Sequence, residues 1–388
     1  MGQPVADAEH PVAPLELFFD LVFVFGFTQV TALLSGDPTW IGLGHALLIL
    51  TALWWVWASY AWLTNTAGAE DGMVVAAVLV ATAAMFVASL AVPEAFGDHG
   101  VVFGAAFLVV CAVQAALYVL TAKSDGELLE AVLRVAPWAL AGATLILVAG
   151  FVGGAARAGL WVAALAVGFV GPGLADLRGW RVQPAHFVER HGLIVIIAIG
   201  ESLVAIGVGT RGTRLGAGEI AAAVLGLVVA MSFWLAYFDF FVIRGRQLLT
   251  DRSGEDRVAF ARDIYTFLHL PMVAGIVLFA FAMETTLAHL HDELGTIPAI
   301  ALCGGPALYL FAYVALRFRV ARTLGRGRLA AMLACLLLIP VALVVPAIVA
   351  LALVAAVWVA LHAYELIWWR EARAEARLQR LPAAGVDA

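Results

Sequence analysis

Four ionisable residues, Glu189, Arg190, His191 and Glu201, stand within one apolar segment of the sequence, at 187–209. Arg190 and Glu201 are eleven residues apart, so on an α-helix they face nearly the same way with about 16 Å between them. Neither can pair with the other, and each needs a partner from another helix. Glu201 lies deep in the segment, where an isolated charge is costly. Burial favours its protonated form, so Glu201 is a candidate proton carrier or, equally, a structural carboxyl hydrogen-bonded within a bundle.

A second apolar segment, at 15–34, has two carboxylates near its beginning. Glu16 and Asp20 are four residues apart and share one face of a helix. Glu16 is expected at the level of the lipid headgroups, where it favours the positive end of the helix dipole. Asp20 lies deeper, among phenylalanines, and is expected to have a buried partner. Gln29, near the middle of the segment, is expected to hydrogen-bond between helices.

Ionisable residues recur at a similar expected depth in other apolar segments. If the helices that carry them cluster, five of these residues come together: Asp20, Arg190, His191, Asp239 and His269. Such a group could relay protons or gate a pathway, because histidine changes charge near neutral pH. It could equally be an ion-pair network that holds helices together.

Metal ligands and cofactor motifs are not predicted. No apolar segment has two histidines at helical spacing, so no metal site and no cofactor is expected. The three cysteines lie within apolar runs without metal-like spacing and are expected to be small core residues. Gly192 and Gly200 flank the stretch between His191 and Glu201. Small residues there permit close helix packing, or a hinge at a binding site.

The elements that position these residues are membrane helices. Hydrophobic residues make up 64% of the 388 residues and charged residues 13%, whereas soluble proteins have about a quarter charged. Apolar runs long enough to cross a bilayer core recur along the chain. The sequence therefore predicts an all-α integral membrane protein with the lipid bilayer as its partner. The first 14 residues lack Lys and Arg, so no cleaved signal peptide is expected.

Twelve membrane spans are predicted. They are 15–34, 40–63, 73–92, 100–122, 134–152, 157–175, 187–209, 217–243, 260–286, 297–316, 328–345 and 347–369. The last two come from one apolar stretch, divided at Pro340 and Pro346 because proline interrupts helices. A single kinked helix there would reduce the number to eleven.

The distribution of basic residues predicts the orientation. With twelve spans and a cytoplasmic N-terminus, all but three of the 22 Lys and Arg residues face the cytoplasm. This asymmetry follows the positive-inside rule and places both termini in the cytoplasm. The terminal tails are then 1–14 and an Arg-rich 370–388. Eleven spans would put the Arg-rich tail outside.

The chain is expected to contain an internal repeat. A shift of 172 residues aligns Gln29 with Glu201, and WASY at 57–60 resembles WLAY at 234–237. The copies are six spans apart, an even number, so the halves have the same orientation, as in the parallel repeats of some secondary transporters. The predicted halves are 15–186 and 187–369.

Four segments carry a resemblance to a known family. They are ELFFDLVFV at 16–24, ERHGLIVIIAIGES at 189–202, WLAYFD at 234–239 and RDIYTFLHLP at 262–271. In this order they resemble the bacterial low temperature requirement protein A family, over nearly the whole chain. The resemblance implies a multi-span inner-membrane protein, and the family name records a cold-growth phenotype. It implies no substrate.

Function is narrowed mainly by exclusion. The sequence has no phosphate-binding G-x-x-x-x-G-K-[ST] loop, no G-x-S-x-G elbow and no H-E-x-x-H helix, so neither ATP-driven transport nor an enzyme is predicted. The Arg-rich loops indicate topology and anionic lipid, and no nucleic-acid partner is expected. The leading hypothesis is a secondary transporter or permease, coupled to protons, for an unknown small solute or ion. An ion channel, or a membrane enzyme or lipid-handling protein for cold or stress adaptation, is the alternative.

Overall fold

The computed structural model describes residues 12–66, 72–174, 176–211 and 215–368. The α-helices there are α1 (Pro14–Gly36), α2 (Trp40–Thr66), α3 (Gly72–Ala91), α4 (Gly100–Thr121), α5 (Gly126–Ala149), α6 (Gly154–Leu174), α7 (Pro184–Gly209), α8 (Ala217–Ala236), α9 (Val242–Thr250), α10 (Gly254–Ala261), α11 (His269–Ala288), α12 (Thr296–Ala321), α13 (Arg326–Leu337), α14 (Ile339–Ala342) and α15 (Ala347–Trp368). The predicted tail 370–388, and 1–11 of the predicted tail 1–14, lie outside the described residues.

Long apolar helices dominate the fold, as the composition predicts. Within the described ranges, ten helical segments are long and apolar enough to cross a membrane. Each coincides with one of the predicted spans. The two remaining predicted spans are 157–175, which falls on α6, and 328–345, which falls on α13 and α14. The protein is therefore an all-helical, polytopic membrane protein.

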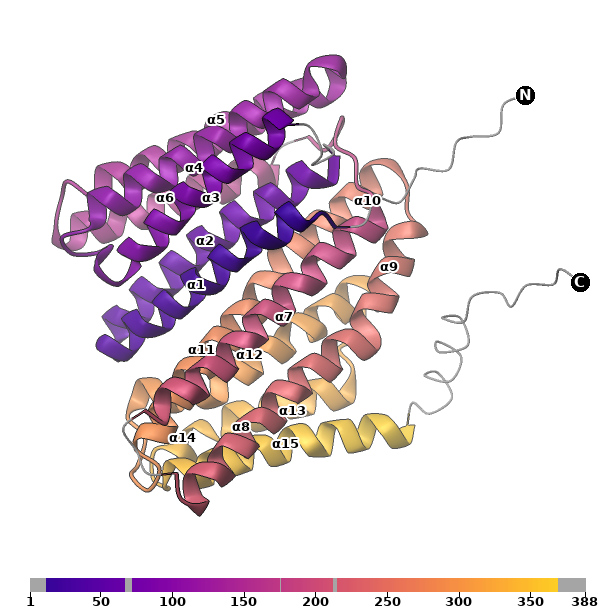
Figure 1. Cartoon of the computed structure of the whole chain (residues 1–388). Helices are drawn as coiled ribbons and strands as arrows, with labels where there is room; N and C mark the ends of the chain where they lie inside the picture. The colour runs from indigo at the N-terminus through magenta and orange to yellow at the C-terminus, as the bar shows by residue number, and fades with distance from the viewer. Residues whose placement is uncertain (1–11, 67–71, 175, 212–214, 369–388) are drawn as a thin grey trace, which may run out of the picture.

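The helices form two groups, which Figure 1 shows as the purple α1–α6 above and the pink-to-yellow α7–α15 below. In the first group, α1 packs on α2 and α3, and α3, α4, α5 and α6 pack in succession. In the second group, α7 packs on α8 and α11, and α11, α12, α13 and α15 pack in succession. The groups meet where α1 and α2 contact α7 and α11.

Two short π-helical segments interrupt long helices of the second group, near the contact between the two groups. One, η3 (Tyr237–Phe241), joins α8 to α9, and the other, η4 (Arg262–Leu268), joins α10 to α11. A π-helical turn shifts the backbone hydrogen-bond pattern by one residue and frees carbonyl groups, and such turns are frequent at functional sites. In η4 the carbonyls of Ile264 and Thr266 accept hydrogen bonds from side chains.

The stretch 328–369 forms two antiparallel segments rather than one kinked helix. α13 packs against α15, and Figure 1 shows the chain reversing at α14. Pro340 lies in the first turn of α14, and Pro346 precedes α15. The reversal is held by Ala347 N–H, which donates to Asp292 O at 2.9 Å. The division at the two prolines is thus correct.

Several helices extend beyond the predicted spans. α5 begins at Gly126 instead of 134 and continues through Pro137. α9 continues the α8 segment as far as Thr250, and α10 extends the α11 segment back to Gly254. These added turns are polar, so they lie outside the apolar runs of the sequence.

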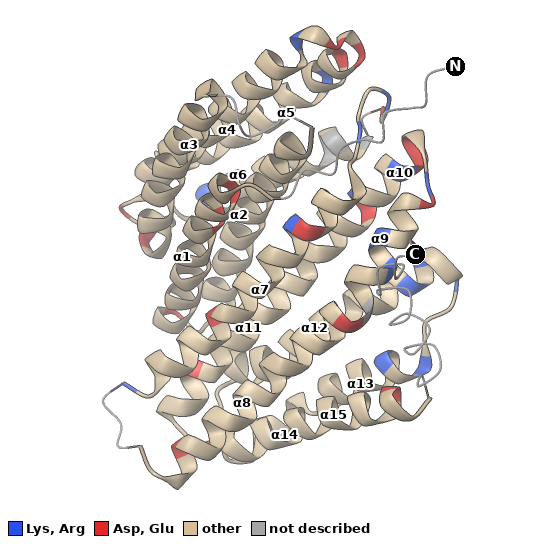
Figure 2. Cartoon of the chain, turned by 45° about the vertical axis from the view of Figure 1, so that its right-hand side comes forward, with Lys and Arg blue, Asp and Glu red and all other residues tan. Residues whose placement is uncertain are grey.

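Charged residues lie mostly near the ends of the helices. Figure 2 shows Lys and Arg gathered at the end that carries α9, α10 and the beginning of α13. A small number of acidic and basic residues lie instead along α1, α7 and α11, at the contact between the two groups. These exceptions form the candidate site.

Candidate functional site

A buried ion pair joins the two groups of helices. Arg190 on α7 donates from Nη1 to Oδ2 of Asp20 on α1 at 2.9 Å, and both side chains are 0% exposed. Nε1 of Trp57 on α2 donates to the other Asp20 oxygen at 2.8 Å. The Arg190 guanidinium carbon lies 5.8 Å from the centre of the Trp57 ring. As the eleven-residue spacing requires, Arg190 takes its partner from another helix.

Glu16 belongs to the same network and lies in the first turn of α1, as predicted, but it is buried by protein. It is 3% exposed, and its Oε1 lies 3.5 Å from Nε of Arg190. Its Oε2 accepts from Ala13 N–H at 2.9 Å and contacts Nε2 of His186 at 3.1 Å. The four-residue spacing explains the burial, because Glu16 shares the face of α1 that carries Asp20 to α7.

The tautomer of His186 follows from its second partner, Asn65. Asn65 accepts from Gln183 N–H through Oδ1 at 2.8 Å, so its amide nitrogen faces His186 Nδ1, at 3.3 Å. Nδ1 must then accept a hydrogen bond, and the ring proton lies on Nε2, from which it is donated to Glu16. The Arg190 guanidinium thus pairs with both Asp20 and Glu16, and these residues form the Arg190 layer.

His191 and His269 form a second buried pair. Their rings are 5.1 Å apart, and both side chains are 0% exposed. His269 Nδ1 donates to the π-helical carbonyl of Ile264 at 2.9 Å, and its Nε2 accepts from the Tyr237 hydroxyl at 2.9 Å. His191 Nδ1 donates to Phe187 O at 2.8 Å, while its Nε2 is buried without a hydrogen-bond partner in the described part of the chain.

Trp57 stands between these two pairs. Its indole N–H binds Asp20, and its ring makes an edge contact with His191 at 4.9 Å. Asp239 lies half-buried on η3. The structure therefore brings Asp20 to Arg190 and His191 to His269, and an indole, which relays no proton, separates them. A relay or gate through all five residues stays a prediction.

Glu201 forms a third polar position, where α7 meets α1. Its side chain is 1% exposed, and Oε2 lies 2.6 Å from the hydroxyl oxygen of Thr28. It stands 17 residues after Pro184 in a 26-residue helix, so it lies about 26 Å along an α7 of about 39 Å. Across the described residues, no basic group lies within ion-pair distance of Glu201. Glu284 on α11 is close enough to repel it when both are ionised.

The other residues singled out in the sequence occupy simpler surroundings. Gln29 is half-buried on α1, one residue after Thr28. A Cβ added to Gly192 would lie 3.4 Å from the Phe238 ring, so this glycine lies at a packed contact. A Cβ at Gly200 would meet nothing within 4 Å. α7 runs unbroken through both glycines.

Metal-ligand residues do not gather within the described ranges: no group of three His, Cys, Asp or Glu side chains could hold a metal ion there. The three cysteines are free and buried.

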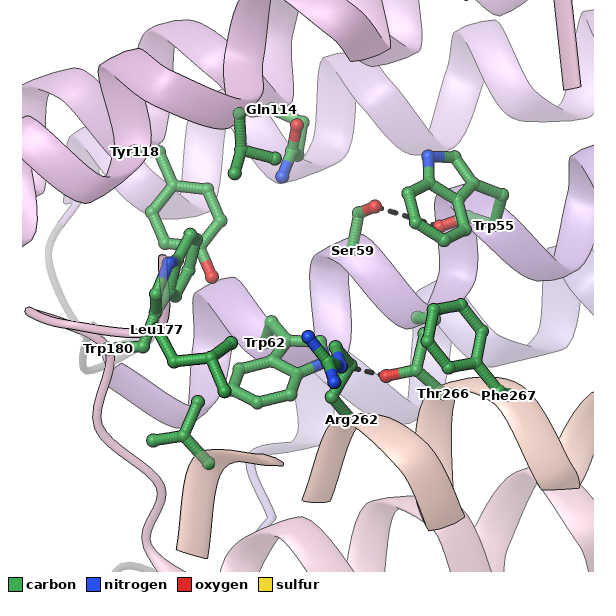
Figure 3. A pocket seen from close by; sticks show the side chains of 13 residues that line it. Trp55, Ser59, Trp62, Gln114, Tyr118, Leu177, Trp180, Arg262, Thr266 and Phe267 are labelled. Carbon is green, nitrogen blue, oxygen red and sulfur yellow. Dashed lines mark hydrogen bonds between the residues drawn. The ribbon is translucent and has the colours of Figure 1, made fainter. Parts of the chain in front are cut away.

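A pocket of about 90 Å³ lies between the two groups of helices. Figure 3 shows its wall, in which Trp55, Ser59 and Trp62 come from α2 and face Gln114 and Tyr118 of α4. Leu177 and Trp180 of the α6–α7 connection and Arg262, Thr266 and Phe267 of η4 complete it. Beside the pocket, a hydrogen bond joins the two groups of helices: Trp62 Nε1 donates to the Thr266 hydroxyl at 2.9 Å. Trp54 Nε1 donates to the backbone carbonyl of the same residue, Thr266, at 2.7 Å.

Sequence reasoning did not identify several residues that complete these positions. Trp57 could have been found, since an indole N–H buried in a membrane helix needs an acceptor. Thr28 could not, because threonine in a helix commonly bonds its own backbone. Tyr237 is conspicuous in the sequence only as part of the repeated WLAY segment. His186 precedes the predicted apolar segment and carried no signal of its own.

Comparison with known proteins places this arrangement in a family. Residues 11–363 match the family model described as bacterial low temperature requirement A protein. The chain is also 31% identical over 311 residues to the uncharacterized protein RA0937 of Rhizobium meliloti (strain 1021), which covers 76% of this chain and 74% of that protein. The family match, over residues 11–363, spans both groups of helices and all three buried polar positions. The chain therefore belongs to the bacterial low temperature requirement A family.

Proposed function

We propose that the protein is a proton-coupled secondary transporter of the bacterial inner membrane, and that Glu201 takes up and releases the proton. One observation carries the proposal. Asp20 and Glu16 are buried beside a cation, whereas Glu201 is equally buried and has a neutral hydroxyl in its place. An uncompensated carboxylate in a membrane bundle is costly, so protonation is the direct way to stabilise it.

The contact with Thr28 suits both protonation states. A hydroxyl has one proton, and Thr28 Oγ1 lies 2.6 Å from Glu201 Oε2 and 3.1 Å from Val24 O. When Glu201 is ionised, Thr28 donates to it. When Glu201 is protonated, it donates to Thr28 Oγ1, which is then able to donate to Val24 O. Glu201 thus has a hydrogen-bond partner in either state without a helix movement.

Glu284 supports the same role. It lies on α11, which packs on both α1 and α7, and it repels an ionised Glu201. A neighbouring carboxylate makes the ionised form of Glu201 more costly and so favours its protonated form.

A six-plus-six repeat is part of the proposal, and the packing supports it. The contacts of α1 with α2 and α3 recur as those of α7 with α8 and α11, and the successive contacts α3–α4–α5–α6 recur as α11–α12–α13–α15. The contact of α2 with α6 recurs as that of α8 with α15. With α6 and the α13–α14 pair as spans, the halves have six spans each and the same orientation.

In this topology both termini are cytoplasmic and Glu201 lies toward the outer side. The Arg190 layer, about 16 Å away along α7, lies toward the cytoplasm. The two layers differ in kind, because the cytoplasmic one is an ion-paired link and the outer one is a protonatable contact. Transporters commonly place substrate and coupling sites at the interface between repeats.

Protonation of Glu201 is tested directly by infrared difference spectroscopy of the purified protein during a pH titration. We expect a carboxylic-acid carbonyl band that titrates in the wild type and is missing in Glu201→Gln. Glu189→Gln is the matched control, because Glu189 lies on the same helix and is exposed. Titration curves that coincide for the wild type and Glu201→Gln would remove Glu201 from the proposal.

Coupling is tested in proteoliposomes with a pH-sensitive dye inside. Under an imposed proton gradient, candidate solutes are added to the wild type, Glu201→Gln and Glu189→Gln. We expect solute-dependent proton movement in the wild type and Glu189→Gln and its loss in Glu201→Gln. Solute flux without proton movement in the wild type would indicate uncoupled transport, and an ion conductance far above carrier turnover would indicate a channel.

A further inference from the structure

The pocket between the two helix groups has the composition of a small-molecule site. Aromatic rings make up much of its wall, and a few polar groups interrupt them, as is usual for ligand pockets. Its volume of about 90 Å³ exceeds the space that one water needs, about 10–15 Å³, several times over. The pocket therefore has room for several waters or for one small planar molecule.

One buried hydroxyl at this pocket makes no hydrogen bond within the part of the chain that the structure describes. Tyr118 is 3% exposed, and its hydroxyl lies near that of Thr66 without a hydrogen bond of good geometry. Figure 3 shows Tyr118 directed from α4 toward Trp62 of α2. Trp55 contributes its ring to the wall, while its indole nitrogen lies on the side of Gly168 of α6. An unpaired buried donor costs about 1–3 kcal/mol, so a ligand with acceptor atoms would be stabilised here.

Arg262 gives the pocket a positive charge. Its Nε and Nη2 donate to Asp263 at 3.2 and 3.0 Å, and its Nη1 donates to Gly173 O at 3.3 Å. Two of its five N–H groups remain for a ligand. Asp263 also pairs with Arg319 at 3.3 Å. Two guanidinium groups share this carboxylate, so the three side chains carry a net charge of +1.

The chemistry of the wall selects an anion with a flat apolar body. Aromatic cages also bind cations, but the wall contains a guanidinium and no carboxylate. A planar ring can stack on the indoles of Trp55 and Trp62, while its acceptor group meets Arg262 and the Tyr118 hydroxyl. We propose that this pocket binds a small aromatic carboxylate.

The proposal that this pocket binds a small aromatic carboxylate does not depend on the proposed function. Only the further step, that this ligand is the transported solute, rests on the proposed function. The pocket joins α2 and α4 of the first group to η4 of the second. A ligand there contacts both groups, so it can favour one relative arrangement of them over another.

The test uses three planar probes of nearly equal size and different charge: benzoate, benzamide and benzamidine. Calorimetry of the full-length protein in detergent measures their binding. We expect benzoate to bind at least tenfold more tightly than benzamide and benzamidine not to bind. Equal affinity for benzoate and benzamide, or tighter binding of benzamidine, would overturn the proposal.

Two substitutions locate the site. Arg262→Gln should weaken benzoate at least tenfold and leave benzamide nearly unchanged, because it removes the charge and leaves Asp263 paired with Arg319. Tyr118→Phe should weaken both probes several-fold and is the variant to use if Arg262→Gln does not fold. The matched controls are Arg244→Gln and Tyr364→Phe, which alter exposed side chains. Benzoate affinity that both site variants retain would place binding elsewhere and refute the pocket.

Failure of this proposal is distinguishable from failure of the transporter. Glu201→Gln should bind benzoate like the wild type, since Glu201 does not line the pocket. Benzoate binding without proton-linked benzoate flux would leave the pocket established and reject aromatic carboxylates as the coupled solute. Proton-linked flux of another solute without benzoate binding would support the transporter and reject this ligand class.

Discussion

Replacement of Arg190 by methionine is expected to destabilise the protein more than replacement of either of its partners. Arg190 is 0% exposed and serves two carboxylates, Asp20 at 2.9 Å and Glu16 at 3.5 Å. Its removal leaves both carboxylates buried without a guanidinium. Loss of one partner of a buried ion pair costs about 3–5 kcal/mol, and two stranded carboxylates place Arg190→Met at about the upper end of that range.

Asp20→Asn is expected to cost less, about 1–3 kcal/mol, because it deletes a charge-assisted hydrogen bond and strands no charge. After this change Arg190 still has Glu16, and the asparagine oxygen can still accept from Trp57. In the double variant Asp20→Asn, Arg190→Met, only Glu16 remains charged, and it keeps its bonds from Ala13 and His186. The double variant should therefore be more stable than Arg190→Met alone.

The assay is equilibrium unfolding in mixed micelles with a rising fraction of denaturing detergent. Cys111, Cys303 and Cys335 are free and buried, so their reaction with a thiol-reactive dye reports loss of the fold. Glu130→Gln is the control, because it breaks an exposed pair with Arg134 that is worth less than about 1 kcal/mol. The reasoning is refuted if Arg190→Met costs no more than Asp20→Asn, or if the two changes add without coupling.

Two further substitutions test the packing around the site by the same assay. Gly305→Ala should destabilise by about 1–3 kcal/mol, because its Cβ would lie 2.6 Å from the carbonyl oxygen of Gly275 on α11. Gly304→Ala is the control and should be neutral or stabilising, because its Cβ meets only ordinary contacts. Equal costs for the two substitutions would contradict the close approach of α11 and α12. Tyr60→Phe should cost about 1–3 kcal/mol, since its buried hydroxyl donates to Val110 O at 3.0 Å, and an unchanged midpoint would mean that this bond adds no stability.

The residues of the candidate site were largely predictable, and their grouping was not. Charged side chains within apolar helices are conspicuous in a sequence, which is why Asp20, Arg190 and Glu201 could be selected. Their spacing also required partners from other helices. Which helix would supply each partner depends on packing between segments some 170 residues apart, and no local pattern encodes that.

The sequence by itself determined the class of fold, the approximate positions of the membrane helices and the family. Hydropathy reports the transfer of each segment into lipid, which is a property of that segment alone. It likewise placed the reversal at Pro340 and Pro346, because proline acts locally on the backbone.

Only the tertiary structure decided which buried charges are compensated. It places Glu16 beside Arg190 and His186, gives Glu201 a hydroxyl instead of a cation, and puts Trp57 between the ion pair and the histidines. It also forms the Trp55–Arg262 pocket from helices of both groups. The physical reason is that burial and pairing are properties of several helices together, and the free energy of a charge in a membrane is decided by what surrounds it.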